Sequence, residues 1–210
     1  MEQKEQTAKW LVVLFWLSIA HLALSVLGDI LRNDYLVSWL QLALNAGMVV
    51  CLFSLRPAQR NYRFAAIFHG IVFLLSTAGL LISSILVRLL ASTGKLEQLQ
   101  ELNNYTSLLA IFQMASSLLA VWFENLAHGS LVEEAASALA KKWRTLFFWQ
   151  LAASVFYSVG TAVAAPLVMF FHWDITTTYA LILSLLQLPG KALKILYILY
   201  LYRTIRLIRE

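Results

Sequence analysis

Six long apolar stretches run through this 210-residue chain and are separated by short polar connections. Each is long enough to cross a bilayer, because a spanning α-helix needs about 20 predominantly apolar residues. The predicted spans cover residues 10–27, 36–55, 64–86, 106–126, 146–171 and 178–202. Helices satisfy their own backbone hydrogen bonds in lipid. The pattern therefore predicts an all-α polytopic membrane protein, a single domain built as a bundle of six transmembrane helices.

Basic residues are distributed unevenly between the two sides of these spans. Three of the flanking ones, Arg32, Arg88 and Lys95, fall on one side. Eleven fall on the other side, at the N-terminus, the even connections and the C-terminus: Lys4, Lys9, Arg56, Arg60, Arg63, Lys141, Lys142, Arg144, Arg203, Arg206 and Arg209. Short loops rich in Lys and Arg stay in the cytoplasm. The distribution predicts a multi-pass protein of the cell membrane with both termini cytoplasmic.

Composition narrows the class of protein further. The chain is 60% hydrophobic and only 13% charged, whereas a soluble domain carries about 25% charged residues. The lipid bilayer is therefore its main surrounding. The net charge of +5 lies at the ends of the apolar stretches, so it is explained by topology and does not indicate nucleic acid. The single cysteine, Cys51, excludes an intramolecular disulfide and a multi-cysteine metal or cluster site.

The connection between the fourth and fifth spans has a helical pattern of its own. After Gly129, Ser130 and Glu133 have the spacing of a capping box. A stripe of apolar side chains then recurs every four residues: Leu131, Ala135, Leu139 and Trp143. This predicts a cytoplasmic amphipathic helix, which either lies on lipid headgroups or offers a docking surface to a protein partner.

Two short motifs of the first span recur at the start of the fifth with the same separation: Lys9-Trp10 with Phe15-Trp16, and Lys142-Trp143 with Phe148-Trp149. Membrane transport folds are often built from internal repeats. One interpretation of the match is a repeat of three helical hairpins, which would bring the first and fifth spans into equivalent places. The alternative is chance, since Trp and Phe are common at the ends of spans.

The last span contains a break, Pro189-Gly190, followed by Lys191 and Lys194. Proline has no N–H to donate to the carbonyl of Leu185. We expect a kink or a short unwound segment, and hence a hinge. In a membrane, non-helical backbone is tolerated only where protein covers it or where it lines a cavity.

The two lysines lie deep in the predicted span. Measured from Arg203 at about 1.5 Å per residue, Lys194 lies roughly 13 Å deep and Lys191 roughly 18 Å deep. Each lysine near the centre of a span costs about 2.5–3.5 kcal/mol on insertion scales. Either they are structural, with Glu124 or a water pocket as partner, or they form an anion-binding or charge-coupling site.

Further polar residues fall in the middle zone of the other spans. The predicted ligand-binding set, arranged around a polar pocket beside the break, is Lys191, Lys194, His21, Asn45, Gln113, Gln187 and Glu124. The alternative is that each hydrogen-bonds a neighbouring helix and has no other role.

No cofactor, metal site or catalytic group is predicted. Bis-histidine haem needs two rings at one depth, and spacing along the chain places His21, His69, His128 and His172 at different depths. The sequence contains neither HExxH nor GxSxG, and no aspartate lies within a span. The sequence therefore favours a protein that is not an enzyme, without deciding the question.

Three functions remain open. The first is a transport or solute-binding subunit that takes a small anionic solute or lipid headgroup beside the break. Six spans with both termini inside are similar in outline to the substrate-binding subunits of vitamin importers, a likeness of topology alone. The second is a scaffold or accessory subunit that docks a protein partner or anionic lipid through its basic cytoplasmic face. The third is a lipid-modifying enzyme that uses Lys191, Lys194 and Glu124.

Overall fold

A computed structural model describes residues 2–31, 34–93, 96–170 and 175–210. Every element in these ranges is an α-helix, which confirms the all-α class. The helices are α1 Glu2–Leu31, α2 Asp34–Ser54, α3 Asn61–Thr93, α4 Leu96–Val132, α5 Ser137–Phe170 and α6 Ile175–Arg209. In the described part of the chain, six helices are long and apolar enough to cross a membrane. Each predicted span falls on one of them, in agreement with a multi-pass membrane protein.

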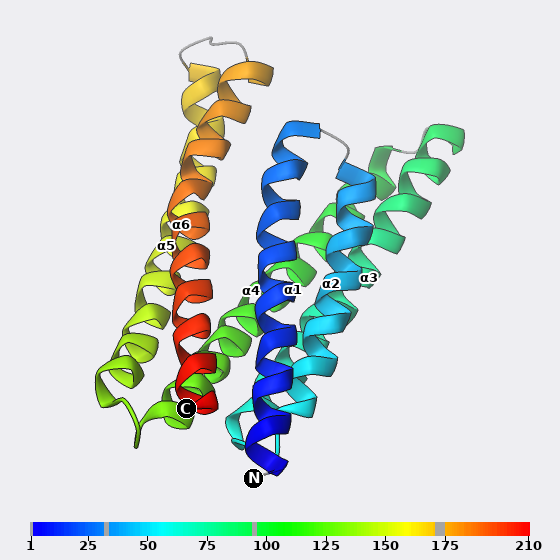
Figure 1. The fold of residues 1–210 in the computed structure, drawn as a ribbon. Helices are drawn as coiled ribbons and strands as arrows, with labels where there is room; N and C mark the ends of the chain where they lie inside the picture. Colours follow the sequence, from blue (N-terminus) through cyan, green and yellow to red (C-terminus); the bar gives the residue numbers. More distant parts are fainter. Residues whose placement is uncertain (1, 32–33, 94–95, 171–174) are drawn as a thin grey trace.

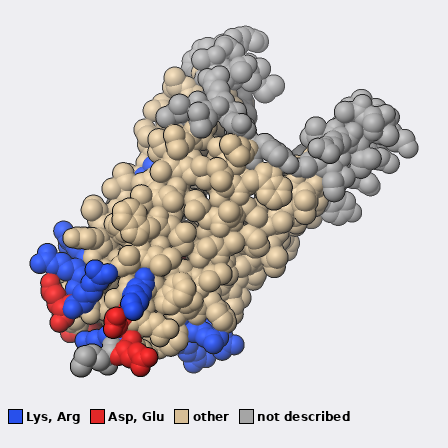
Figure 2. Space-filling model, turned by 45° about the vertical axis from the view of Figure 1, so that its right-hand side comes forward, with Lys and Arg blue, Asp and Glu red and all other residues tan. Residues whose placement is uncertain are grey.

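Both termini lie at the same end of the molecule, together with the α2–α3 and α4–α5 connections (Figure 1). Lys and Arg side chains gather at this end, which is called the basic end below (Figure 2). Of the three basic residues predicted on the other side, Arg32 and Lys95 lie outside the described residues. The structure thus places the two termini together.

Each helix packs against the next one in sequence, and α1 and α6 close the ring. α4 also touches α6 across the ring. The pairs α1–α2, α3–α4 and α5–α6 are antiparallel neighbours, but α2 packs on α3 and α4 on α5 as well. The hairpin repeat remains a prediction.

The packed core lies in the half of the bundle near the basic end. Its largest fully buried side chains include Tyr62, Trp143 and Leu201, from α3, α5 and α6. Large apolar side chains elsewhere, such as Trp16 and Leu74, point outward and are more than 60% exposed, as expected for a surface that faces lipid. Toward the opposite end, the α5–α6 pair diverges from α1 and α2 (Figure 1).

The predicted separate amphipathic helix before the fifth span is wrong. α4 continues through Gly129 and Ser130 to Val132, and α5 begins at Ser137. The apolar stripe does not lie on headgroups, because Leu139 and Trp143 are buried in the core. A four-residue apolar spacing is typical of an interfacial helix, but in this structure Leu139 and Trp143 belong to the first turns of the spanning helix α5.

The unwound alternative at the break in the last span is also wrong. α6 stays α-helical from Ile175 to Arg209 with Pro189 inside it. A proline removes one N–H donor from the helix, and the remaining hydrogen bonds along these 35 residues hold the helix together. Of the two alternatives, a kink at Pro189-Gly190 remains, and the hinge stays a prediction.

Candidate functional site

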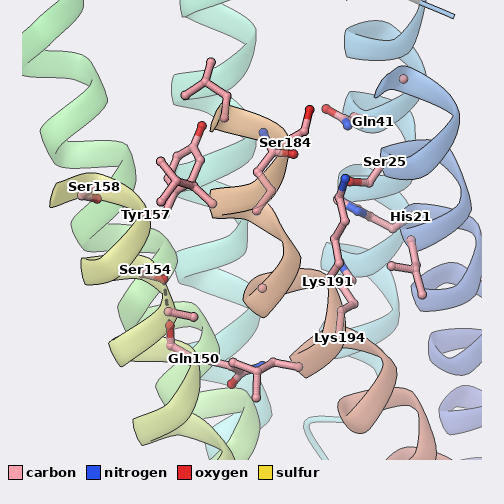
Figure 3. Close-up of a pocket in the computed structure, with 18 of the residues that line it drawn as sticks. His21, Ser25, Gln41, Gln150, Ser154, Tyr157, Ser158, Ser184, Lys191 and Lys194 are labelled. Carbon is pink, nitrogen blue, oxygen red and sulfur yellow. Dashed lines mark hydrogen bonds between the residues drawn. The ribbon is translucent and has the colours of Figure 1, made fainter. Parts of the chain in front are cut away.

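A cavity of about 1490 Å³ opens between α1, α2, α5 and α6, and α4 contributes to its wall. It occupies the region where the α5–α6 pair diverges from α1 and α2 (Figures 1 and 3). Apolar side chains alternate in its lining with polar side chains from four helices: His21, Ser25, Ser38, Gln41, Gln150, Ser154, Tyr157, Ser158, Ser184, Gln187, Lys191 and Lys194. The cavity therefore offers both apolar surface and hydrogen-bonding groups.

The basic groups of the cavity come from two facing helices. Lys191 and Lys194 are three residues apart on α6, so they lie on one face of that helix. His21 comes from α1, and Figure 3 shows Lys191 near His21 and Ser25. Among the described residues that line the cavity, none is acidic. The site is therefore suited to a ligand that carries negative charge.

The structure brings together four residues of the predicted ligand-binding set. Lys191, Lys194, His21 and Gln187 all line the cavity. Gly190 lines it as well and has open space beside its Cα. The ring of His21 has its Nδ1 atom buried and without a hydrogen-bond partner in the described structure. This atom is a polar group that a ligand can satisfy.

The remaining predicted residues lie elsewhere. Asn45 interacts with His21 from α2 but is not part of the lining. Gln113 donates a hydrogen bond to the Ser76 hydroxyl of α3 at 3.1 Å, on another side of α4. Glu124 is not in the cavity and belongs to a buried cluster described below. Spacing along the chain had predicted their depth, but not the direction in which they point.

Sequence analysis missed the contribution of α5. Gln150, Ser154, Tyr157 and Ser158 all line the cavity. The signal was present, because these positions follow the i, i+4, i+7, i+8 spacing of one helix face. It was easily overlooked because serine in a membrane helix can satisfy itself on its own backbone, as the Ser154 hydroxyl does by donating to the Gln150 carbonyl at 2.9 Å.

A second polar feature, called the Glu124 cluster, lies next to the cavity toward the basic end. It consists of Tyr62 and His69 from α3, Glu124 and His128 from α4, and Tyr197 from α6. Glu124 is 4% exposed and His128 is 0% exposed. The proposed pairing of Glu124 with the lysines is replaced by direct contacts to histidine and tyrosine.

The hydrogen bonds of the Glu124 cluster have a defined direction. The Tyr197 hydroxyl donates to Glu124 Oε1 at 2.5 Å, and His69 Nε2 lies 3.1 Å from Glu124 Oε2. Having donated its only hydrogen, the Tyr197 oxygen must accept from His128 Nε2 at 3.2 Å. His128 Nδ1 then accepts from the Tyr62 hydroxyl at 2.8 Å. This assignment rests on counting hydrogens, and it satisfies the chain from Tyr62 to Glu124.

His69 and His128 thus approach the same carboxylate, although spacing along the chain had placed the two histidines at different depths. His69 Nε2 lies 3.1 Å and His128 Nε2 3.8 Å from Glu124 oxygens. The prediction of separate depths is wrong for this pair because α4 continues beyond the predicted span and keeps His128 inside the core. Within the described residues, no group of three His, Cys, Asp or Glu side chains has an arrangement suited to a metal ion.

The cavity and the Glu124 cluster are neighbours on two helices. On α6, Lys194 lines the cavity, and Tyr197, three residues later, belongs to the cluster. On α4, Val121 lines the cavity, and Glu124, three residues later, belongs to the cluster. Three residues correspond to a rise of about 4.5 Å. The charges of Lys194 and Glu124 interact, although the two side chains form no direct ion pair in the described structure.

A second connection runs through α5. Gln150 lines the cavity and accepts a hydrogen bond from Asn125 of α4 at 2.7 Å. Asn125 is 2% exposed, and the Oδ1 atom of its side chain is buried without a hydrogen-bond partner in the described structure. Polar side chains of α4 and α5, as well as those of α6, therefore lie between the cavity and the buried core.

Comparison with known proteins adds no functional assignment: no family model matches the chain, and neither curated proteins nor solved structures gave a match.

Proposed function

We propose that this protein is a membrane transport or solute-binding subunit that holds an anionic solute or lipid headgroup in the cavity between α1, α2, α5 and α6. The observation that carries the proposal is the placement of Lys191, Lys194 and His21 around one cavity whose described lining contains no acidic side chain. Ionisable residues inside a span are costly and mark ligand or ion pathways.

The shape of the cavity supports a ligand with an apolar part. Its volume of about 1490 Å³ exceeds the 300–1,000 Å³ or so that is usual for small-molecule sites. Leu181, Leu186 and Leu193 line the same α6 face as the two lysines. Apolar area near a basic group suits an amphiphilic anion.

We further propose that the basic end faces the cytoplasm, because loops rich in Lys and Arg are retained there. The cavity would then lie on the outer side of the packed core. Both termini would be cytoplasmic in the cell membrane.

The cavity is favoured over the two alternative functions. The scaffold hypothesis used the basic face together with an exposed amphipathic helix, and Leu139 and Trp143 of that helix are buried. The enzyme hypothesis relied on Glu124 acting beside Lys191, and Glu124 is not part of the cavity lining. A protein partner at the basic end remains a prediction.

The proposal is tested by ligand-dependent thermal stability of the purified protein in lipid nanodiscs. The probes are sulfate for a free solute, short-chain phosphatidylglycerol for an anionic lipid, and short-chain phosphatidylcholine as the neutral control. A ligand present at 100 times its Kd stabilises by about 2.7 kcal/mol. We expect stabilisation by at least one anionic probe and none by phosphatidylcholine.

The Lys191→Gln/Lys194→Gln double variant should lose this stabilisation. Lys142→Gln is the matched control, because Lys142 is exposed at the basic end. Equal stabilisation of all three proteins, or a response to phosphatidylcholine as strong as that to the anions, would refute the anion site.

A further inference from the structure

We propose that the Glu124 cluster is a proton-binding site coupled to the cavity, so that an anion entering the cavity is accompanied by uptake of one proton. The coupling of proton uptake to anion binding rests on the proposed anion-binding function. The proton site itself is carried by the geometry of the cluster, independently of any ligand.

The first argument is the net charge of the buried cluster. In the hydrogen-bond assignment above, His128 and both tyrosines are neutral and Glu124 carries one negative charge. With a neutral His69, the cluster as a whole carries that one negative charge. The group is enclosed by protein, with Glu124 4% and His128 0% exposed. A buried charge is strongly unfavourable unless an opposite charge nearby compensates it. Addition of one proton makes the cluster electrically neutral.

The second argument concerns the groups that face Glu124. The ionisable side chains that interact with it in the described structure are Cys51 of α2, Tyr62 and His69 of α3, His128 of α4, and Lys194 and Tyr197 of α6. α5 adds the Trp143 ring, stacked on His128 at 4.5 Å, and α1 adds the Ser18 hydroxyl beside Tyr197. Lys194 is thus the only lysine or arginine among them. It compensates Glu124 from the cavity side.

The third argument is that Lys194 serves two negative partners. It interacts with Glu124 and, as a lining residue, with the contents of the cavity. An anion in the cavity adds a second negative charge next to the same ammonium group. For a monoanion, one proton gained by the cluster returns the combined charge of the anion, Lys194 and Glu124 to its value before binding; for a dianion such as sulfate, one proton offsets half of the added charge. The proton is taken from bulk water and is held by Glu124 or by the histidine bonded to it, so that charge and atoms balance.

Linkage makes this coupling reciprocal: if anion binding favours proton uptake, lower pH favours anion binding by the same factor. For uptake of one proton, the affinity for the anion tightens by up to about tenfold for each pH unit lowered. Sulfate and phosphatidylglycerol are suitable probes because neither changes its own charge near neutral pH.

The first measurement uses no ligand. A pH-difference infrared spectrum of the protein in nanodiscs should contain a carboxylic acid band that the Glu124→Gln variant lacks. In the Tyr197→Phe variant, which loses the hydrogen bond to the carboxylate, the midpoint of this band should shift to higher pH. If no pH-dependent band, carboxyl or imidazole, responds to Glu124→Gln, the proton site is refuted, whether or not an anion binds.

The second measurement tests the coupling. The Kd of sulfate and of phosphatidylglycerol is determined between pH 5 and pH 8, and proton uptake on binding is read with a pH indicator in weak buffer. Wild type should take up close to one proton per anion bound. Glu124→Gln, or His69→Gln if that variant does not fold, should bind with an affinity that does not vary with pH.

The possible outcomes separate the two proposals. Binding without proton uptake and with a pH-independent Kd leaves the anion site intact and overturns the coupling. Absence of any anion binding overturns the proposed function and the coupling together, while the infrared titration still decides whether Glu124 binds a proton.

Discussion

Tyr197 provides the sharpest test of the Glu124 cluster, because its hydroxyl connects the carboxylate to His128. It donates to Glu124 at 2.5 Å and accepts from His128 at 3.2 Å. The Tyr197→Phe substitution keeps the ring and its edge-on contacts with His128 and Trp143. It removes one oxygen atom and two hydrogen bonds, and leaves Glu124 with its contacts to the histidines alone.

The expected loss of stability follows from the charge and burial of these partners. A hydrogen bond to a charged group contributes about 1.5–3 kcal/mol, whereas hydrogen bonds between membrane helices average about 0.6 kcal/mol and reach about 1.7. The lower average reflects unfolded states that find other partners. We use the range for charged groups because Glu124 is ionised in the assigned hydrogen-bond chain and is only 4% exposed. We expect a loss of about 2 kcal/mol in the free energy of unfolding, roughly 30-fold in the folding equilibrium.

The assay is reversible unfolding in mixed micelles, with Tyr202→Phe as the matched control. Tyr202 lies on the same helix and is 56% exposed, so loss of its hydroxyl should change stability by less than about 0.5 kcal/mol. A double-mutant cycle with Glu124→Gln should give a coupling energy of at least about 1 kcal/mol. If Tyr197→Phe is no more destabilising than Tyr202→Phe, the assigned hydrogen-bond chain is wrong.

Two further predictions concern packing, both read from the same unfolding assay. In Gly160→Ala the new Cβ would lie 2.5 Å from Leu186 Cδ2 and 3.2 Å from its Cγ, so α5 and α6 must adjust and we expect a loss of about 1 kcal/mol even though Ala is the better helix former. Gly79→Ala has nothing within 4 Å of the new Cβ and should be neutral or stabilising, and equal effects at both sites would contradict the close approach. Trp143→Phe should cost about 3 kcal/mol, because a fully buried ring shrinks and the Thr204 hydroxyl loses its 3.1 Å hydrogen bond. Adding Thr204→Val should recover part of this loss, since it removes the unpaired hydroxyl, and purely additive losses would show that this bond contributes little.

The positions of the six helices could be predicted from the sequence because bilayer thickness fixes how long an apolar run must be. Where the helices end was harder to predict. His128 and Gly129 resemble a break, yet α4 continues through both. A Cβ at Gly129 would lie 3.4 Å from the Ala140 carbonyl and 3.6 Å from Trp143 Cβ, so this glycine lies where α4 and α5 approach closely. Sequence alone does not separate a glycine that ends a helix from one that lets a neighbouring helix approach.

Only part of the candidate site could be predicted, because the sequence gives the position of a residue along a helix but not the direction of its side chain. Spacing along a helix predicts depth in the membrane, and it grouped Lys191, Lys194 and His21, which line one cavity in the structure. It does not give the direction of a side chain around the helix axis, which depends on how the helices are arranged. Gln113 thus faces α3, and Glu124 faces histidines. The cluster could not be foreseen, because its members come from three helices and become neighbours only when these pack.

The division of the bundle into a packed half and an open half links the two proposed sites. The buried core is concentrated near the basic end, where Trp143, Tyr62 and Leu201 have no exposed surface. The cavity occupies the region where α5 and α6 diverge from α1 and α2. The buried core resists displacement, so a change in cavity shape is expected to come from movement of α5 and α6 relative to α1 and α2. The Glu124 cluster lies at the boundary, where Lys194 and Tyr197 are one turn apart on α6, so a change of charge there acts on the segment that joins the packed half to the open half.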